Sequence, residues 1–297
     1  MRLVSLLPSA TEIVYALGLG DDLVGVTFEC DEPASARTEK EVVVGGRDTS
    51  GMTPAEIDGY VRGQVARGAD LYTLRADALA RLRPELILTQ DLCRVCALPA
   101  GQVTAALDYL GCRADVLTID PYTLDDVLGT ILAVGMRTGA GDRARHVVDG
   151  LRARLARVAA LTAGRPRPRV AVIEWTDPPF AAGHWIPDLV SAAGGVPVAA
   201  RPGRRSEPVT WPEVAAARPD LVIVAPCGYR LAGAVAQAAA VAAELPGVPV
   251  WAVDADGLVV RPGPRLVDGV EAIAAILHPD AVPAPPPDRV ARVSSGA

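Results

Sequence analysis

A long amphipathic stretch without proline divides this chain into two parts. It runs from Thr123 to Leu161, and its apolar residues, beginning with Leu124, Val127 and Leu128, recur at the spacing of an α-helix. Two aspartates follow Thr123, which makes this threonine a suitable N-terminal cap. The stretch is longer than a usual globular helix and is typical of a helix that connects two bodies. The sequence therefore predicts two lobes joined by one long α-helix.

Each lobe has the pattern of an α/β fold. Strand-like and helix-like runs alternate on both sides of the long stretch, which predicts parallel sheets with crossover helices. A length of 297 residues accommodates two Rossmann-like lobes of this kind. The predicted parts are an N-terminal α/β lobe over 1–122, the linking helix over 123–163, a C-terminal α/β lobe over 164–280, and a disordered tail over 281–297 that is rich in proline, serine and glycine.

Composition excludes several classes of function. The formal net charge is −6 and no basic block occurs, so nucleic-acid binding is not expected. Lys40 is the only lysine, so a phosphate-loop lysine or a Schiff-base lysine elsewhere is excluded. No stretch of 18 apolar residues occurs, and the apolar run over 3–7 is too short for the core of a signal peptide. We therefore expect a cytoplasmic protein without a membrane span.

Known catalytic motifs are missing from the sequence. It contains no Gly-x-Ser-x-Gly turn, no Gly-x-Gly-x-x-Gly after a first strand, and no zinc-protease motif. Paired acids do occur, for example Asp254 and Asp256, but turn-forming residues flank them. The sequence therefore favours a non-catalytic binding protein over an enzyme.

The loops that follow the predicted strands supply the candidate ligand-binding residues. In open parallel sheets, ligands bind beyond the carboxyl ends of the strands. Aromatic residues make up only 4% of the chain, yet several fall in or beside these loops, which suits a large flat ligand. The candidates are Ser9, Phe28, Glu29, Arg47, Gln90, Trp175, Phe180, His184, Trp185, Tyr229 and Arg230.

Trp175 has the most direct structural argument among these candidates, and Trp185, His184 and Arg47 carry explicit alternatives. Trp175 follows a predicted strand directly, and the stiff Asp177-Pro178-Pro179 turn would fix its direction. Trp185 could instead pack between helices. His184 could be an axial ligand to cobalt or iron, or a structural histidine. Arg47 could meet an anionic group of a ligand, or it could lie in a surface turn.

Four of the five cysteines also fall in strand-end loops. Cys93 and Cys96 form a Cys-x-x-Cys pair, which lets two thiolates reach one soft metal ion. With Cys30 and Cys227 they would complete a four-thiolate site for zinc or an iron–sulfur cluster. Two alternatives stay open: the cysteines are small buried apolar residues, or Cys93 and Cys96 form a redox dithiol. The fifth, Cys112, follows a predicted helix and fits a buried or spare thiol.

Several segments resemble a known family. The run from Leu7 to Gly18, which begins Leu-Pro-Ser-Ala-Thr-Glu, and the Gly18-Leu19-Gly20-Asp21 turn resemble the opening of substrate-binding proteins for cobalamin and ferric siderophores. The segments 83–88 and 218–223 resemble the leads into one strand of each lobe in that family, and 183–195 resembles a second-lobe segment that ends in Gly-Gly. The cobalamin-binding branch is the most similar.

This resemblance implies a fold, a ligand and a partner. The fold is the class III substrate-binding plan, in which a helical backbone joins two α/β lobes. The implied ligand is cobalamin or another metal chelate, held between the lobes, and the implied partner is an ABC transporter or a cobalamin-using protein. The alternative function is a cytosolic metalloprotein that holds zinc or an iron–sulfur cluster through its cysteines and has redox or sulfur chemistry.

Overall fold

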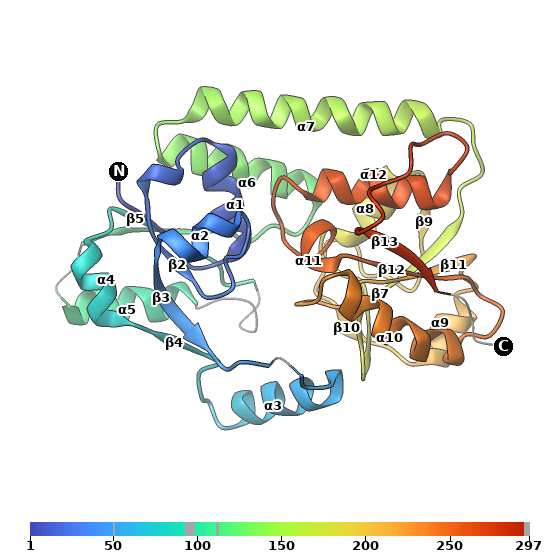
Figure 1. The fold of residues 1–297 in the computed structure, drawn as a ribbon, viewed down its shortest axis with the longest axis horizontal. Helices are drawn as coiled ribbons and strands as arrows, with labels where there is room; N and C mark the ends of the chain where they lie inside the picture. Colours follow the sequence, from blue (N-terminus) through green and yellow to red (C-terminus); the bar gives the residue numbers. More distant parts are fainter. Residues whose placement is uncertain (50, 93–98, 111–112, 294–297) are drawn as a thin grey trace. The chain divides into compact units, whose positions relative to one another are not determined.

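The computed structural model describes residues 1–49, 51–92, 99–110 and 113–293. The chain divides into two units (Figure 1). Unit 1 contains residues 1–121 and 128–148, and unit 2 contains residues 122–127 together with residues from 149 onward. Each unit has its own sheet and its own apolar core. The predicted two-lobed α/β fold is therefore confirmed.

Unit 1 is built on a sheet with the strand order β4-β3-β2-β1-β5-β6. All neighbouring strands pair in parallel except β3 and β4, which are antiparallel. The chain goes from β1 to β2 on one side and later returns to β5 on the other side. The strands are β1 (Leu3–Ser5), β2 (Leu23–Thr27), β3 (Glu41–Gly46), β4 (Tyr72–Leu74), β5 (Leu86–Thr89) and β6 (Asp115–Thr118).

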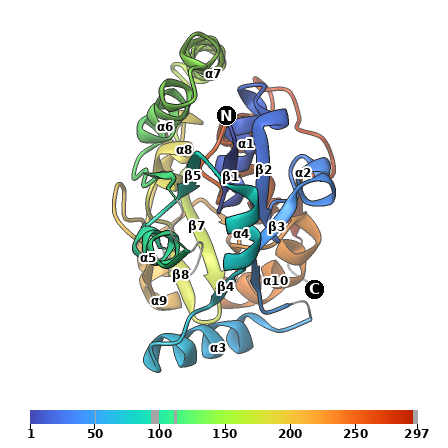
Figure 2. The same cartoon turned by 90° about the vertical axis from the view of Figure 1, so that its left-hand side faces the viewer.

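The helices of unit 1 lie between its strands along the chain. They are α1 (Pro8–Ala16), the short 3-10 helix η1 (Gly20–Asp22), α2 (Ala34–Glu39), α3 (Pro54–Ala66), α4 (Ala76–Leu82) and α5 (Ala100–Leu110). Leu79 of α4 and Leu107 of α5 pack with Val4 and Ile87 of the sheet in one buried cluster. In contrast, no residue of α3 is buried. Figures 1 and 2 show α3, in light blue, beyond the end of the β3–β4 hairpin.

Unit 2 is built on a mixed sheet with the order β10-β8-β7-β11-β12-β13, and β9 also pairs with β7. The central strands β7, β11 and β12 are parallel, whereas β8, β10 and β13 pair antiparallel. The strands are β7 (Arg169–Thr176), β8 (Pro179–Ala181), β9 (Val196–Pro197), β10 (Glu207–Pro208), β11 (Leu221–Val224), β12 (Val250–Val253) and β13 (Val290–Val293).

The helices of unit 2 cover this sheet and each other. They are α8 (Ile186–Ala192), α9 (Trp211–Ala216), α10 (Leu231–Glu244), α11 (Ala255–Leu258) and α12 (Leu266–Leu277). Ala238 and Val241 of α10 pack on Val222 and Ala252 of the central strands. None of the helices in the described part of the chain is both long and apolar enough to span a membrane.

The linking segment consists of two helices instead of the single helix that the sequence predicted. These are α6 (Leu124–Arg137) and α7 (Gly141–Thr162), and each contributes residues to both units. Gly139 has a φ of +72° in the left-handed region, which ends α6. A Cβ atom on Gly135 would lie 2.4 Å from the Cβ of Ala144, so the two helices approach closely. The predicted cap is present, because Thr123 Oγ1 accepts from the Asp126 N–H at 3.1 Å.

The predicted disorder of the tail is wrong for the described residues up to 293. Residues 290–293 form β13, which pairs antiparallel with β12 over the whole of both strands. Val282 is buried as well. The proline-rich composition of the tail led to the prediction, but the edge of β12 offers backbone partners that composition does not reveal.

Candidate functional site

Two aromatic rings, one from a strand and one from a loop, meet at the carboxyl ends of the central strands of unit 2. Trp175 lies near the end of β7, and Tyr229 lies in the loop after β11. Their ring centroids are 6.1 Å apart and the ring planes are inclined by 51°. Both side chains are partly exposed. This separation and tilt are typical of a favourable aromatic pair, which leaves part of each ring surface open to a ligand.

A third aromatic residue lies on the neighbouring strand. Phe180 of β8 is directly opposite Trp175 in the antiparallel register. Directly opposite residues of an antiparallel pair place their side chains on the same face of the sheet. Phe180 is also partly exposed. We refer to Trp175, Phe180 and Tyr229 as the aromatic group of unit 2.

Short local contacts fix the two rings of the pair. The indole N–H of Trp175 donates to the backbone oxygen of Asp177 at 3.1 Å, which holds the ring over the turn between β7 and β8. Tyr229 lies against α10 at a glycine, since a Cβ atom on Gly233 would lie 2.5 Å from the Tyr229 ring. The backbone oxygen of Tyr229 accepts from Asp256 N–H at 3.2 Å. Burial raises the pKa of the Tyr229 hydroxyl, so this group stays neutral.

A glutamate beside Trp175 connects three loops of unit 2. One carboxylate oxygen of Glu174 accepts from Gly183 N–H at 2.7 Å, and the other accepts from the Ser206 hydroxyl at 2.6 Å. The backbone oxygen of Glu174 accepts from Cys227 N–H at 3.1 Å. The loops around the aromatic group are therefore fixed by hydrogen bonds.

His184 and Trp185 occupy the loop before α8. The backbone of His184 has a φ of +49°, in the left-handed region. Its ring lies 5.8 Å from Tyr122 and 5.5 Å from Trp185, measured between centroids. Its Nε2 atom is buried without a hydrogen-bond partner in the structure. Burial, with a smaller effect of Arg205, lowers the pKa of this histidine.

Trp185 is buried, and its indole N–H donates to Val259 O at 2.8 Å, so it packs inside unit 2.

The first-lobe candidates lie at or near strand ends of unit 1. Ser9 in the first turn of α1 and Gln90 after β5 are buried. Phe28 follows β2 and is partly exposed, and its ring centroid is 6.3 Å from that of Tyr72. Glu29 is also partly exposed, and its N–H donates to the Thr27 hydroxyl at 3.0 Å.

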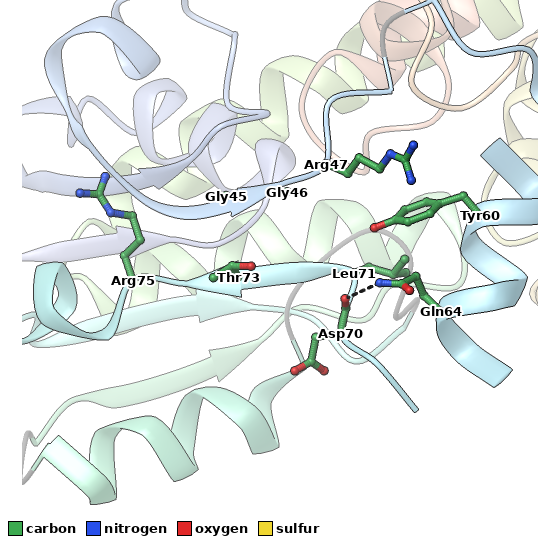
Figure 3. A pocket seen from close by; sticks show the side chains of 9 residues that line it. All are labelled: Gly45, Gly46, Arg47, Tyr60, Gln64, Asp70, Leu71, Thr73 and Arg75. Atoms are coloured by element: carbon green, nitrogen blue, oxygen red, sulfur yellow. Dashed lines mark hydrogen bonds between the residues drawn. The ribbon is translucent and has the colours of Figure 1, made fainter. Parts of the chain in front are cut away.

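The remaining two candidates are arginines. Arg230 is exposed and is the residue before α10. Arg47 is exposed and follows β3, and its guanidinium carbon lies 4.5 Å from the centre of the Tyr60 ring. A pocket of about 450 Å³ lies beside this pair (Figure 3).

Two of the four predicted cysteine ligands are described, and they belong to different units. Cys30 of unit 1 is buried, and its sulfur lies 3.1 Å from the Thr11 hydroxyl, which donates to it. Cys227 of unit 2 is exposed. Cys93, Cys96 and Cys112 lie outside the described residues. Within those residues no group of three or more His, Cys, Asp or Glu side chains could hold a metal ion. The four-thiolate site therefore stays a prediction.

Several residues of these sites do not follow a predicted strand end. Tyr60 belongs to a helix and Tyr72 to a short strand that was not predicted, so neither followed an expected strand end. Glu174 lies inside β7, where a charged residue directly after a run of buried apolar residues was the available signal.

Comparison of the sequence with known proteins identifies related proteins over most of the chain. The sequence signature of the periplasmic binding protein family matches residues 3–253. A vitamin B12-binding protein of Vibrio cholerae is 27% identical over 288 residues, which cover 93% of this chain and 88% of that protein. An uncharacterized ABC transporter substrate-binding lipoprotein of Bacillus subtilis is 26% identical over 296 residues, which cover 94% of this chain and 80% of that protein.

Solved structures have the same fold. The crystal structure of the periplasmic vitamin B12-binding protein of Vibrio cholerae matches with a TM-score of 0.64 and 26% identity, over 93% of this chain and 96% of that one. A periplasmic heme-binding protein of Pseudomonas aeruginosa matches with a TM-score of 0.71 and 23% identity, over 100% of this chain and 99% of that one. The family resemblance of the sequence segments is thereby confirmed. Because the family signature covers well over half of the sequence, this chain belongs to the periplasmic binding protein family.

Proposed function

We propose that this protein binds a cobalamin-like ligand, or another flat metal chelate, without changing it chemically, and that the aromatic group of unit 2 contacts that ligand. The observation that carries this proposal is the pair of partly exposed rings of Trp175 and Tyr229, which are 6.1 Å apart at the carboxyl ends of β7 and β11. Phe180, opposite Trp175, adds a third ring. Partly exposed aromatic residues at strand ends are the side chains that a flat apolar ring system requires.

The energetics of such a site agree with a binding role. An aromatic side chain buries roughly 150–250 Å² when covered, and such residues dominate the energy of many interfaces. The loops that carry the rings are already fixed through Glu174 and through the Trp175–Asp177 hydrogen bond. A preformed site loses less conformational entropy on binding, so more of the contact energy contributes to affinity.

The relatives support the ligand class and a partner. The Vibrio cholerae relative is named for vitamin B12 binding and covers most of this chain. The Bacillus subtilis relative is named as an ABC transporter substrate-binding protein. We therefore propose delivery of the ligand to an ABC transporter, with a cobalamin-using protein as the second possible recipient.

A titration followed by visible absorption tests the binding proposal. The full-length protein is mixed with hydroxocobalamin, and in parallel with hemin, and each mixture is desalted before the bound chromophore is measured. We expect saturable retention of at least one of these chelates. Trp175→Ala should weaken its binding by about tenfold or more, because it removes a central aromatic contact. Trp175→Phe keeps an aromatic ring and is the matched control. We expect its affinity for the chelate to change by roughly threefold or less. Retention of neither chelate, or equal affinity of the alanine variant, would overturn the proposal.

A further inference from the structure

A second site of different chemistry lies within unit 1. The pocket of about 450 Å³ in Figure 3 is formed by one continuous segment, from the end of β3 through α3 to the residue after β4. All of the described residues that line it therefore belong to unit 1. Its volume falls in the range of small-molecule sites. The lining residues include Gly45, Gly46, Arg47, Tyr60, Asp70 and Arg75.

Two glycines at the end of β3 leave room for this pocket. A Cβ atom on Gly45 would meet no other atom within 4 Å, so open space lies beside this part of the strand. A Cβ atom on Gly46 would lie 2.8 Å from the Phe28 ring, so a side chain there would disturb the adjoining strand end. The pocket wall thus consists of backbone where the chain passes from β3 to Arg47.

Arg47 is the cation that this pocket presents. Its guanidinium is held over the Tyr60 ring at 4.5 Å, and Figure 3 shows the two side chains facing each other. Within the described residues no carboxylate lies within ion-pair distance of Arg47. Its charge is therefore oriented by an aromatic ring but is not neutralised by an acid.

The other charged residues of the pocket already have partners. Arg75 donates from Nη1 to Val42 O at 3.1 Å. The Asp70 carboxylate accepts from Gln102 Nε2 at 2.5 Å, and Figure 3 shows it turned away from Arg47. The Tyr60 hydroxyl, in contrast, points into the pocket and can donate to a ligand. Among its described residues, the pocket therefore offers a ligand the Arg47 cation and hydroxyl groups such as that of Tyr60 (Figure 3).

The wall that carries Tyr60 is helix α3, and local hydrogen bonds hold both of its ends. Thr53 and Glu56 form a capping box at the start of α3, and Gln64 donates to Asp70 O at 3.4 Å near its end. No residue of α3 is buried, so the helix gains little stability from packing. A ligand in the pocket would contact both α3 and β3, and would thereby stabilise the helix.

We propose that this pocket binds a small organic anion, with a carboxylate or a phosphate group held by the Arg47 guanidinium and the Tyr60 hydroxyl. A guanidinium presents a planar set of donors that matches both groups in bidentate geometry. Because Tyr60 already orients the Arg47 side chain, little further order is needed on binding. This proposal goes beyond the proposed function, since no residue of the aromatic group lines this pocket.

Isothermal titration of the full-length protein with inorganic phosphate and with succinate, at constant ionic strength, tests this site. Saturable binding of either anion supports the proposal and identifies the preferred group. Arg47→Gln should weaken that binding by about tenfold or more, since it removes a charged hydrogen-bonding partner. Arg62→Gln is the matched control: Arg62 is on the same helix, pairs with Asp58 at 2.8 Å and does not line the pocket. The affinity of the Arg62→Gln variant for the anion should stay within about twofold of that of the unchanged protein.

A second readout separates specific binding from general charge attraction. Hydrogen exchange of the α3 amides should slow when the bound anion is added, because the ligand joins α3 to β3. Tyr60→Leu should reduce both the affinity and this protection. Binding of neither anion, or equal weakening by Arg47→Gln and Arg62→Gln, would overturn the proposal.

Discussion

The Arg289 guanidinium lies 2.6 Å from the carboxylate of Asp254, and the Asp254 N–H donates to Arg289 O at 2.8 Å. Asp254 follows β12 and is buried, whereas Arg289 directly precedes β13. These contacts hold the last strand of the described chain to the sheet of unit 2. They also neutralise a carboxylate that would otherwise lie buried without a positive partner.

Arg289→Met should therefore lower the free energy of unfolding. We expect a loss of about 1–3 kcal/mol, because the substitution leaves the Asp254 carboxylate buried with fewer partners. Urea denaturation followed by circular dichroism measures it. Arg292→Met in β13, where the side chain is exposed, is the control and should change stability by roughly 0.5 kcal/mol or less. Equal effects of the two substitutions would contradict the role assigned to Arg289.

This contact also explains why the tail was mispredicted. The run of prolines over 285–287 gives the tail a disordered composition, and the four-residue β13 is too short to produce a convincing pattern. The strand forms because β12 has a free edge and Asp254 requires a cation, and both facts belong to the folded sheet. In contrast, α9 and α10 were predictable from sequence, since turn residues bound their periodic runs.

Gly269→Ala should destabilise unit 2. A Cβ atom at Gly269 of α12 would lie 1.9 Å from the backbone oxygen of Leu258, so α12 could not keep its place against α11. Overpacking of this kind costs roughly 1–3 kcal/mol or more. Gly150→Ala in α7 is the matched control: it has open space around it, and should raise stability by about 0.5–1 kcal/mol through helix propensity. A neutral or stabilising Gly269→Ala in urea denaturation would be inconsistent with this packing.

Glu174→Ala should loosen the loops around the aromatic group. It removes the acceptor of both Gly183 N–H and the Ser206 hydroxyl, which are part-buried donors, and we expect a loss of about 2 kcal/mol in unfolding free energy. Glu174→Gln keeps one acceptor oxygen, so its unfolding free energy should fall by less than that of Glu174→Ala. The same urea titrations measure both variants. Equal losses in the two variants would show that the paired acceptors do not stabilise the loops.

His184 should make the stability of the protein depend on pH. Burial, and then the charge of Arg205, hold its folded-state pKa below the ordinary value of 6.5. As the pH falls below about 6.5 the unfolded chain takes up this proton first, so stability is lost progressively until the pH passes the lowered pKa. Asparagine tolerates the left-handed φ of +49° at this position, so His184→Asn is the suitable variant.

The measurement is the melting temperature of both proteins between pH 7.5 and 5. As the pH falls, the melting temperature of the unchanged protein should fall more than that of the His184→Asn variant. A constant difference between the two proteins over this range would show that His184 is not desolvated in the folded state.

The candidate sites were only partly predictable from sequence. Trp175, Phe180 and Tyr229 were predictable, because they follow or border strands whose carboxyl ends must lie on one edge of a parallel sheet. The partnership of Arg47 with Tyr60 was not, because it depends on how α3 returns beside β3. The same limit applies to the packing of Trp185, whose partner Val259 is distant in sequence.

Retention of hydroxocobalamin by the full-length protein and by its Trp175→Ala and Trp175→Phe variants shows whether the aromatic group of unit 2 binds a flat metal chelate. Each protein is mixed with the ligand, desalted, and examined by visible absorption over a range of ligand concentrations, with hemin as the second chelate. We expect saturable binding of at least one chelate that weakens by about tenfold or more in the alanine variant and is largely kept in the phenylalanine variant. A protein that retains neither chelate, or an alanine variant that binds as tightly as the unchanged protein, would contradict it.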